Sequence, residues 1–176
     1  DFSGKATANV QARFGLISDQ NPPKPDFKAR VALSDVDLAK PMEGHKITGV
    51  DGKLDIDPQA ARLEAKGRID TVPAEIMLVE PIDKGSSVKR ERVITASLNN
   101  DQRDRLVPGL SDIIDGTVAV ELSLVDDKHQ AVKLDLGKAA LSIPYVGWTK
   151  GSGIPAKASF ELSKTDSRTS IEKFAL

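Results

Sequence analysis

The sequence is marked first by what it lacks. None of its 176 residues is cysteine, which excludes disulfides, thiol nucleophiles and zinc sites built from cysteine. Aromatic residues make up only 4% and the formal net charge is −1, so neither base-stacking platforms nor a basic phosphate-binding surface is expected. Nucleic acid is therefore not an expected partner. In addition, no apolar run reaches the roughly 18 residues of a membrane-spanning helix.

Motifs that carry catalysis are also missing from the sequence. It contains no glycine-rich phosphate loop, nucleophile elbow or His-Glu-x-x-His. The two histidines, His45 and His129, have no neighbours at metal-site or triad spacing, and we expect both in exposed loops. Asp51, Asp55 and Asp57 lie close together but lack the ligand order of a calcium loop. We expect no catalytic residue, metal site, cofactor or enzymatic activity; paired carboxylates in a polar cleft would be the remaining catalytic alternative.

Alternation of apolar and polar side chains dominates what is present. Between Ala61 and Ile69, small or apolar side chains occupy the odd positions and charged ones the even positions. Similar runs occur near residues 6–14, 27–33, 94–98, 118–124, 132–136 and 156–162. Successive side chains of a strand point to opposite faces, so this period of two predicts antiparallel strands with one apolar and one solvated face.

Turn signals separate these runs at short intervals, among them Asp51-Gly52 and Asp115-Gly116. Residues 99–107 differ, because Asn99 can cap a helix that Pro108 stops, and a second turn is possible at residues 110–114. We expect Leu106 or Val107 to pack this short helix on the sheet. The predicted fold is mainly β: a curved antiparallel sheet, as an open groove or half-barrel, with one short helix near 99–107.

A motif occurs twice, about eighty residues apart. Lys53-Leu54-Asp55-Ile56 leads to Val72-Pro73-Ala74, and Lys133-Leu134-Asp135-Leu136 leads to Ile154-Pro155-Ala156. The spacing predicts strand–turn–strand repeat units at about 50–80 and 130–162, within a single domain spanning 1–176. Because the chain begins at Asp1 without Met, we interpret it as a piece of a longer protein.

The predicted apolar face has two interpretations. A second sheet and the short helix could cover it as a closed core, or it could form a trough for hydrocarbon chains, whose burial contributes about 0.8 kcal/mol per methylene. Its small and aliphatic side chains leave both open. The candidate lipid-contacting residues, chosen from alternation alone, are Val31, Leu33, Leu54, Ile56, Leu63, Ile76, Leu78, Ile94, Leu98, Val118, Val120, Leu122, Leu134, Leu136 and Phe160.

Several segments resemble the AsmA-like proteins of the bacterial envelope, which include the TamB and YhdP types. These are Gly52 to Leu78 with its Gly-Lys-Leu-Asp-Ile and Val-Pro-Ala, and Asn99 to Leu124 with its Leu-Asn-Asn-Asp-Gln-Arg-Asp-Arg-Leu. The most specific segment is Ala140-Leu-Ser-Ile-Pro-Tyr-Val-Gly-Trp-Thr-Lys-Gly-Ser-Gly-Ile-Pro-Ala156, which is similar to the Leu-Pro-x-x-Gly-Trp-x-Lys-x-x-Gly-x-Pro-Ala run of YhdP-like chains. The resemblance covers most of residues 26–163.

This resemblance implies an AsmA-like β domain that is an internal section of a bridge between bacterial membranes. Such a section would bind phospholipid acyl chains in an apolar groove and support lipid transport and outer-membrane integrity. Its partners would be phospholipid, neighbouring repeats of the same polypeptide and the inner membrane, reached through an anchor outside this chain. The location would be the periplasm of a Gram-negative bacterium. The alternative is a scaffolding module for outer-membrane proteins that adds its strand edges to a partner's sheet.

Overall fold

The computed structural model describes residues 2–13, 26–41, 44–83, 85–165 and 168–176. Contacts divide the chain into two compact units, which we name unit 1 (Asp1–Arg92) and unit 2 (Val93–Leu176). Each is built mainly from antiparallel strands in an open sheet, and the only α-helix among the described residues is short. The predicted fold class, a mainly β open antiparallel sheet with one short helix, is therefore confirmed.

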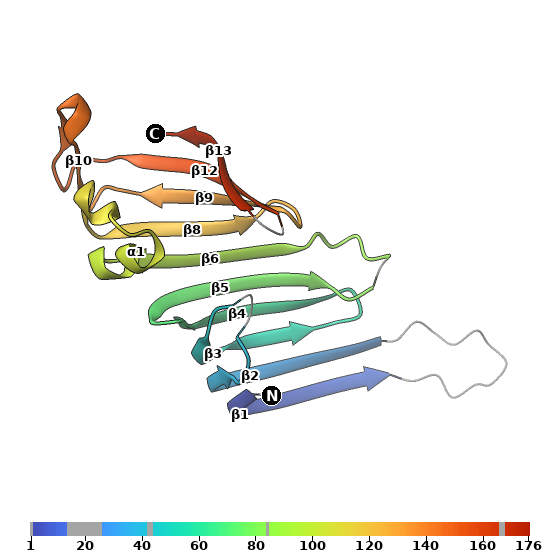
Figure 1. The fold of residues 1–176 in the computed structure, drawn as a ribbon. Helices are drawn as coiled ribbons and strands as arrows, with labels where there is room; N and C mark the ends of the chain where they lie inside the picture. Colours follow the sequence, from blue (N-terminus) through green and yellow to red (C-terminus); the bar gives the residue numbers. More distant parts are fainter. Residues whose placement is uncertain (1, 14–25, 42–43, 84, 166–167) are drawn as a thin grey trace. The chain divides into compact units, whose positions relative to one another are not determined.

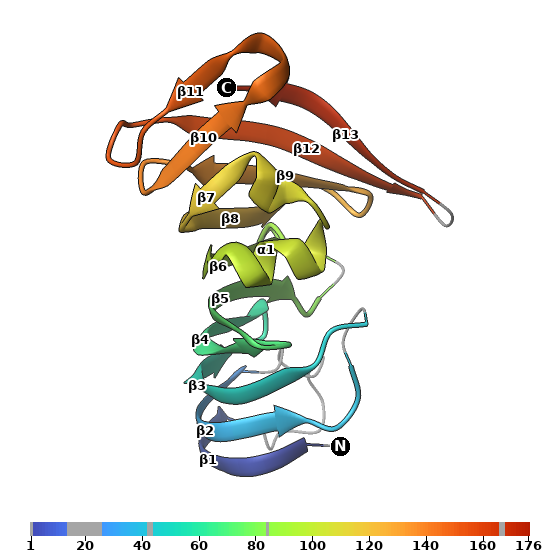
Figure 2. The same ribbon diagram turned by 60° about the vertical axis from the view of Figure 1, so that its left-hand side comes forward.

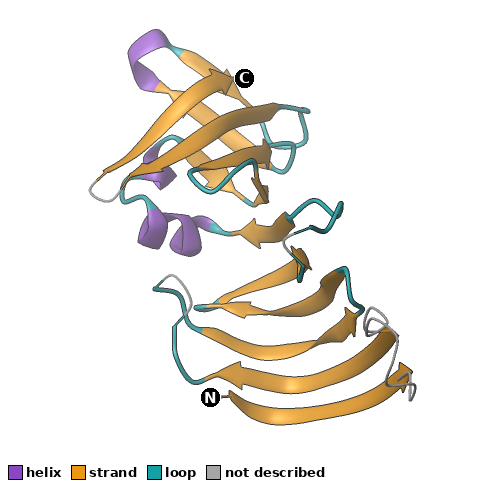
Figure 3. Ribbon diagram, turned by 90° about the vertical axis from the view of Figure 1, so that its right-hand side faces the viewer, coloured by secondary structure: helices purple, strands orange, loops and turns teal. Residues whose placement is uncertain are grey.

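Unit 1 is an antiparallel meander in which every strand pairs with its neighbour in sequence (Figure 1). Its strands are β1 (Phe2–Arg13), β2 (Asp26–Leu38), β3 (Ile47–Ile56), β4 (Ala60–Ile69) and β5 (Val72–Pro81). β1, β2 and β4 contain the alternating runs near residues 6–14, 27–33 and 61–69, except that residue 14 lies outside the described residues, whereas β3 and β5 carry the first copy of the repeated motif. The strands bow along their length (Figure 3), as expected for twisted sheet.

Bulges interrupt three neighbouring strands at one end of unit 1. The register shifts between Ser3 and Lys5 in β1, between Leu33 and Val36 in β2, and between Thr48 and Asp51 in β3. The extra residues Gly4, Asp35 and Gly49 all have positive φ. A Cβ on Gly4 would lie 2.3 Å from the Asp35 carbonyl oxygen, so glycine is required there.

These bulges change which side chains reach the apolar face. An extra residue reverses the alternation, so Val36 joins Leu33 on the same face of β2. Val36, Ile47, Val50 and Ala65 form a buried cluster, against which Leu33, Leu38 and Leu63 pack. This end of unit 1 is therefore filled by its own side chains, which a strict period of two does not predict.

Unit 2 contains two sheets (Figure 2). The larger has the order β6-β8-β9-β12-β13, from β6 (Glu91–Leu98), β8 (Val118–Leu124), β9 (His129–Asp135), β12 (Lys157–Thr165) and β13 (Arg168–Ala175). The smaller has the order β11-β10-β7, from β7 (Ile114–Gly116), β10 (Ala139–Ile143) and β11 (Trp148–Lys150). The chain between β9 and β12 leaves the larger sheet to build β10 and β11, which pack back on it.

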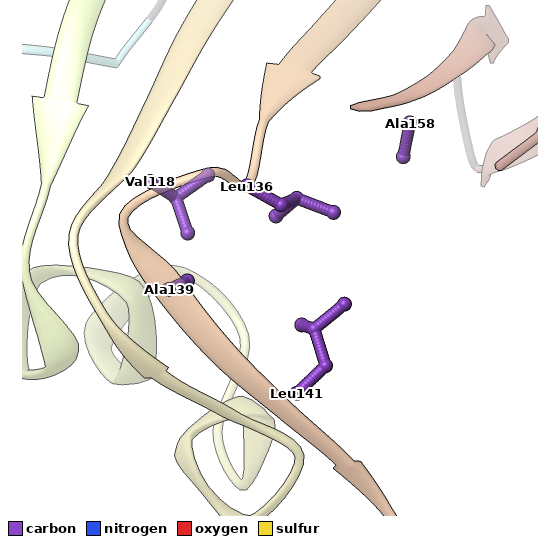
Figure 4. Close-up of a cluster of buried hydrophobic side chains, with 5 residues drawn as sticks. All are labelled: Val118, Leu136, Ala139, Leu141 and Ala158. Carbon is purple, nitrogen blue, oxygen red and sulfur yellow. The ribbon is translucent and has the colours of Figure 1, made fainter. Parts of the chain in front are cut away.

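The two sheets of unit 2 enclose a core (Figure 4). Val118 and Ala158 come from β8 and β12, Ala139 and Leu141 from β10, and Leu136 follows β9; their side chains form one buried cluster. Val118 and Leu136 are each only 2% exposed. Ile114, Val120, Leu134 and Ala156 pack against this cluster.

The short helix α1 (Asn100–Leu106) forms where the sequence predicts it, with η1 (Leu110–Asp112) as the following turn. Asn99 and Gln102 make a capping box, each side chain accepting from the other's backbone N–H at 2.9 and 3.0 Å. The expectation that Leu106 or Val107 packs the helix is wrong, because both are more than half exposed. A buried Arg103 anchors the helix instead.

The two copies of the repeated motif lie in different surroundings. Residues 53–56 end β3 and Val72-Pro73-Ala74 begins β5, with β4 between these strands. Residues 133–135 end β9, whereas Ile154-Pro155-Ala156 precedes β12, which pairs directly with β9. The same motif therefore occurs in two settings. In unit 1 it lies in a simple meander, whereas in unit 2 its second part leads from the smaller sheet back into the larger sheet.

Candidate apolar face

The candidate site is the apolar face of unit 1. Direct cross-strand pairing places Ala8 opposite Val31, Val31 opposite Leu54, Leu54 opposite Leu63, and Leu63 opposite Leu78. These five residues, which we name the central row, make a continuous line across β1 to β5. With neighbouring strands about 4.8 Å apart, the row is about 19 Å long.

Parallel rows widen this face on both sides. Ala6, Leu33, Gly52, Ala65 and Ile76 are in register on one side, and Val10, Ala29, Ile56 and Ala61 on the other. Alternation thus brings all seven candidate residues of unit 1 to one face. Ile76 is buried, and Val31, Leu33, Leu54, Ile56, Leu63 and Leu78 are partly exposed.

The opposite face of unit 1 carries ion pairs between strands. Arg30 on β2 lies 3.2 Å from Asp55 on β3, and Lys66 on β4 lies 2.8 Å from Glu75 on β5. The hydrogen bond from Lys66 to Glu75 raises the pKa of the Lys66 amine. Unit 1 is therefore amphipathic, and its charged face is exposed to solvent.

The strands of unit 1 contact mainly their adjacent strands, and in the described residues no helix or second sheet of this unit packs on the central row. Most of its aliphatic side chains remain partly exposed, apart from Ile76 and the end closed by Val36, Ile47 and Val50. An apolar surface of this kind, continuous and incompletely covered, is typical of a binding site.

The candidate residues of unit 2 are in a different environment. Ile94, Leu122, Val132 and Phe160 are in register across β6, β8, β9 and β12, and Phe160 also stacks on Phe174 with ring centroids 6.5 Å apart. Leu98 pairs with Val118, and Val120 with Leu134. Val118 and Leu136 are core residues, so the closed-core interpretation applies to this part of the predicted face.

Lys150 is the residue of structural importance that sequence reasoning missed. It is 6% exposed, and its Nζ donates to the carbonyl oxygens of Leu136, Ala139, Gly151 and Ile154 at 2.7–3.1 Å. Four carbonyl dipoles replace the water shell of the ammonium group. Lys150 thereby fixes the smaller sheet to the loop before β12. Lys150 lies in the Trp-Thr-Lys-Gly-Ser-Gly run of the sequence, but residue spacing alone does not reveal that a lysine is buried.

Arg103 has the same role beside the helix. Its guanidinium donates to the carbonyl oxygens of Leu98 and Ile114 at 3.1 and 2.7 Å, and to that of Gly116. A further bond reaches Asn100 Oδ1 at 2.7 Å. Arg103 is therefore committed to holding α1 and β7 together, which explains why this helix needs no large apolar anchor.

Both histidines are paired with carboxylates that their sequence spacing did not reveal. His45 Nδ1 lies 2.8 Å from Asp70 Oδ2, and His129 Nδ1 lies 2.8 Å from Asp126. The hydrogen bond from His45 lowers the pKa of Asp70, whereas the backbone N–H of Lys128 does most to lower that of Asp126. Both pairs are substantially exposed to solvent, and in each the carboxylate also accepts a backbone N–H near a turn. Their geometry fits turn stabilisation.

The acidic residues 51–57 have separate structural partners. Asp51 accepts the backbone N–H of Asp35, Asp55 pairs with Arg30, and Asp57 accepts two backbone N–H groups of the β3–β4 turn. In the described parts of the chain, no three His, Cys, Asp or Glu side chains come together where a metal could bind. No helix among the described residues is both long and apolar enough to cross a membrane.

No family model, curated protein or solved structure matches this chain.

Proposed function

We propose that the apolar face of unit 1 binds the acyl chains of phospholipids and that the chain acts by binding, without catalysis. The observation that supports this most is the central row, a line of aliphatic side chains about 19 Å long by strand spacing. An acyl chain needs only continuous apolar surface, and this row offers it without a polar interruption.

The free energy expected from burying an acyl chain on this face favours weak binding, in which the chain stays mobile. A chain lying on an open face loses water on one side only, so ten methylenes contribute about 4 kcal/mol, half of the full value. This corresponds to a dissociation constant of roughly 1 mM for a single site. Adjacent rows offer nearly equivalent positions, so a bound chain can shift without crossing a large barrier. Passive sliding is the mechanism that such a surface supports.

The wider setting is part of the same proposal. The AsmA-like resemblance of residues 26–163 suggests a section of a periplasmic bridge, tethered to the inner membrane through sequence outside this chain. An open amphipathic sheet suits that role, because neighbouring repeats of the polypeptide would extend its apolar surface. Lipid transport and outer-membrane integrity are the functions we propose for the full-length protein.

A matched pair of variants on β2 tests acyl binding. Val31 lies in the central row, and Ala32 points to the charged face, opposite Lys53. We expect Val31→Asp to weaken binding of a fluorescent phospholipid by at least about tenfold, because a carboxylate must be desolvated under the acyl chain. Ala32→Asp should bind like the wild type. Circular dichroism checks folding, and Val31→Ser replaces Val31→Asp if the charge unfolds the sheet. Equal binding by both β2 variants would refute the proposal.

One observation favours the alternative function, scaffolding through strand edges. β1 ends the strand order of unit 1, and all of its residues are exposed. Such an edge presents backbone N–H and C=O groups that a partner's strand can pair with. A stable complex with an outer-membrane protein that contains no lipid would favour this alternative, whereas co-purified phospholipid in native mass spectrometry would count against it.

A further inference from the structure

The β10–β11 hairpin of unit 2 carries the only tyrosine and the only tryptophan of the chain. Tyr145 lies within its turn, η2 (Pro144–Val146), at the outer end of the hairpin (Figure 3), and Trp148 begins β11 two residues after the turn. Tyr145 is 99% exposed and Trp148 is 42% exposed. Leaving two aromatic side chains in water at one turn is less favourable than burying their apolar surface.

The turn holds these side chains in a defined position. Pro144 begins η2, and Gly147 ends it with φ 63°, its N–H donating to the Pro144 carbonyl oxygen at 3.2 Å. Trp148 pairs directly with Ile143 on β10. The hairpin is anchored at its base by the buried ammonium group of Lys150. Presentation of Tyr145 and Trp148 is therefore built into the fold.

Charge is absent from the outer part of this hairpin. Residues 139–149 include no Asp, Glu, Lys or Arg, and Lys150, which follows, directs its amine into the unit. Carboxylates lie on two neighbouring segments. Asp115 of β7 pairs with Ala140 on β10, and the hydrogen bond from Ser142 N to Ile113 O places η1, with its exposed Asp112, beside β10. An uncharged tip can enter a lipid headgroup region without the cost of desolvating an ion.

We propose that the tip formed by Tyr145 and Trp148 inserts into the interfacial region of a phospholipid bilayer. Tyrosine and tryptophan are the residues that favour this region, since each has an apolar ring and a polar group. The tip is too small for a stable protein interface: two rings supply at most about 500 Å², whereas each partner normally buries about 800 Å². The exposed Asp112 on the neighbouring η1 favours zwitterionic over anionic lipid. This inference does not depend on acyl binding by unit 1.

Trp148 provides its own probe, because no other tryptophan contributes to the emission. The experiment adds phosphatidylcholine vesicles to the whole chain and records the emission wavelength and quenching by phosphatidylcholine brominated on its acyl chains. We expect a shift to shorter wavelength and quenching. Tyr145→Ser should lower the partition coefficient roughly tenfold, since it removes one buried ring. The control Leu106→Ser, at a position 58% exposed on α1 and outside both the tip and the unit 1 face, should leave partitioning unchanged.

The outcomes separate this inference from the proposed function. Val31→Asp should keep the vesicle-induced shift of Trp148 even if it abolishes acyl binding by unit 1. A shift that persists while the two β2 variants bind phospholipid equally would support the tip and refute the unit 1 proposal. An emission that vesicles leave unchanged, or wild-type partitioning by Tyr145→Ser, would overturn membrane insertion of the tip.

Discussion

Units 1 and 2 use the same alternation of apolar and charged residues but treat the apolar face differently. In unit 1 the central row of Ala8, Val31, Leu54, Leu63 and Leu78 has no second layer of the unit upon it in the described residues. In unit 2 the smaller sheet covers Val118, Leu136 and Ala158. Alternation therefore predicts that an apolar face exists, while the connections between strands decide what covers it.

The connection that makes the difference follows the strand motif Lys-Leu-Asp. In unit 1 the chain passes from β3 through a tight Asp57 turn into β4, which stays in the same sheet. In unit 2 it passes from β9 into β10, which leaves the sheet and packs on it. Lys150 then closes this layer through four carbonyl oxygens. One connection keeps an apolar face open, and the other converts it into a core.

The largest expected contrast is between two leucines. Leu136→Ala removes a side chain that is 2% exposed in the core of unit 2, so we expect a loss of about 2–5 kcal/mol in the free energy of unfolding. Leu54→Ala truncates a partly exposed side chain and should lose about 1 kcal/mol. Urea unfolding followed by circular dichroism measures both. Equal losses would mean that the unit 1 face is packed as tightly as the core.

A second contrast concerns the buried cation. Lys150→Met keeps the aliphatic stem but removes the ammonium group that donates to four carbonyl oxygens, so we expect a loss of about 3 kcal/mol in stability. Lys157→Met is the matched control, because Lys157 is exposed on β12 and should change stability by less than about 0.5 kcal/mol. Trp148 emission during urea unfolding reports this region directly. If the two variants proved equally stable, Lys150 would not be what secures the smaller sheet.

The smallest expected effect is a pH dependence in unit 1. Backbone N–H groups of Ala60 and Gln59, followed by Arg62, hold the pKa of Asp57 below its ordinary 3.8. Its carboxylate therefore stabilises the folded state above the ordinary pKa, and this stabilisation is lost as pH falls through the lowered value. Asp57→Asn should make the melting temperature less dependent on pH below about 4 than in the wild type. If the melting temperatures of the wild type and Asp57→Asn fell equally with pH, the stability of the β3–β4 turn would not depend on this charge.

Sequence patterns predict much of the fold but less of the site. The period of two predicts most strands of the larger sheets and assigns Val31, Leu54 and Leu63 to one face, since side-chain direction is local geometry. The Asn99 cap and Pro108 likewise predict α1. Bulges at Asp35 and Gly49 are not predictable by alternation, because they arise from pairing between distant strands. Nor does the pattern around Val118 or Leu136 differ from that around Leu54, so their burial under β10 required the structure.

The central claim is that acyl chains bind on the uncovered face of unit 1 and not in the core of unit 2. Nuclear magnetic resonance of methyl-labelled protein with a phospholipid that carries a nitroxide on its acyl chain tests this most directly. We predict signal broadening at the methyl groups of Val31, Leu54, Leu63 and Leu78, with Val118, Leu136 and Leu141 little affected. Unbroadened signals along the central row, or stronger broadening in the unit 2 core, would contradict the account.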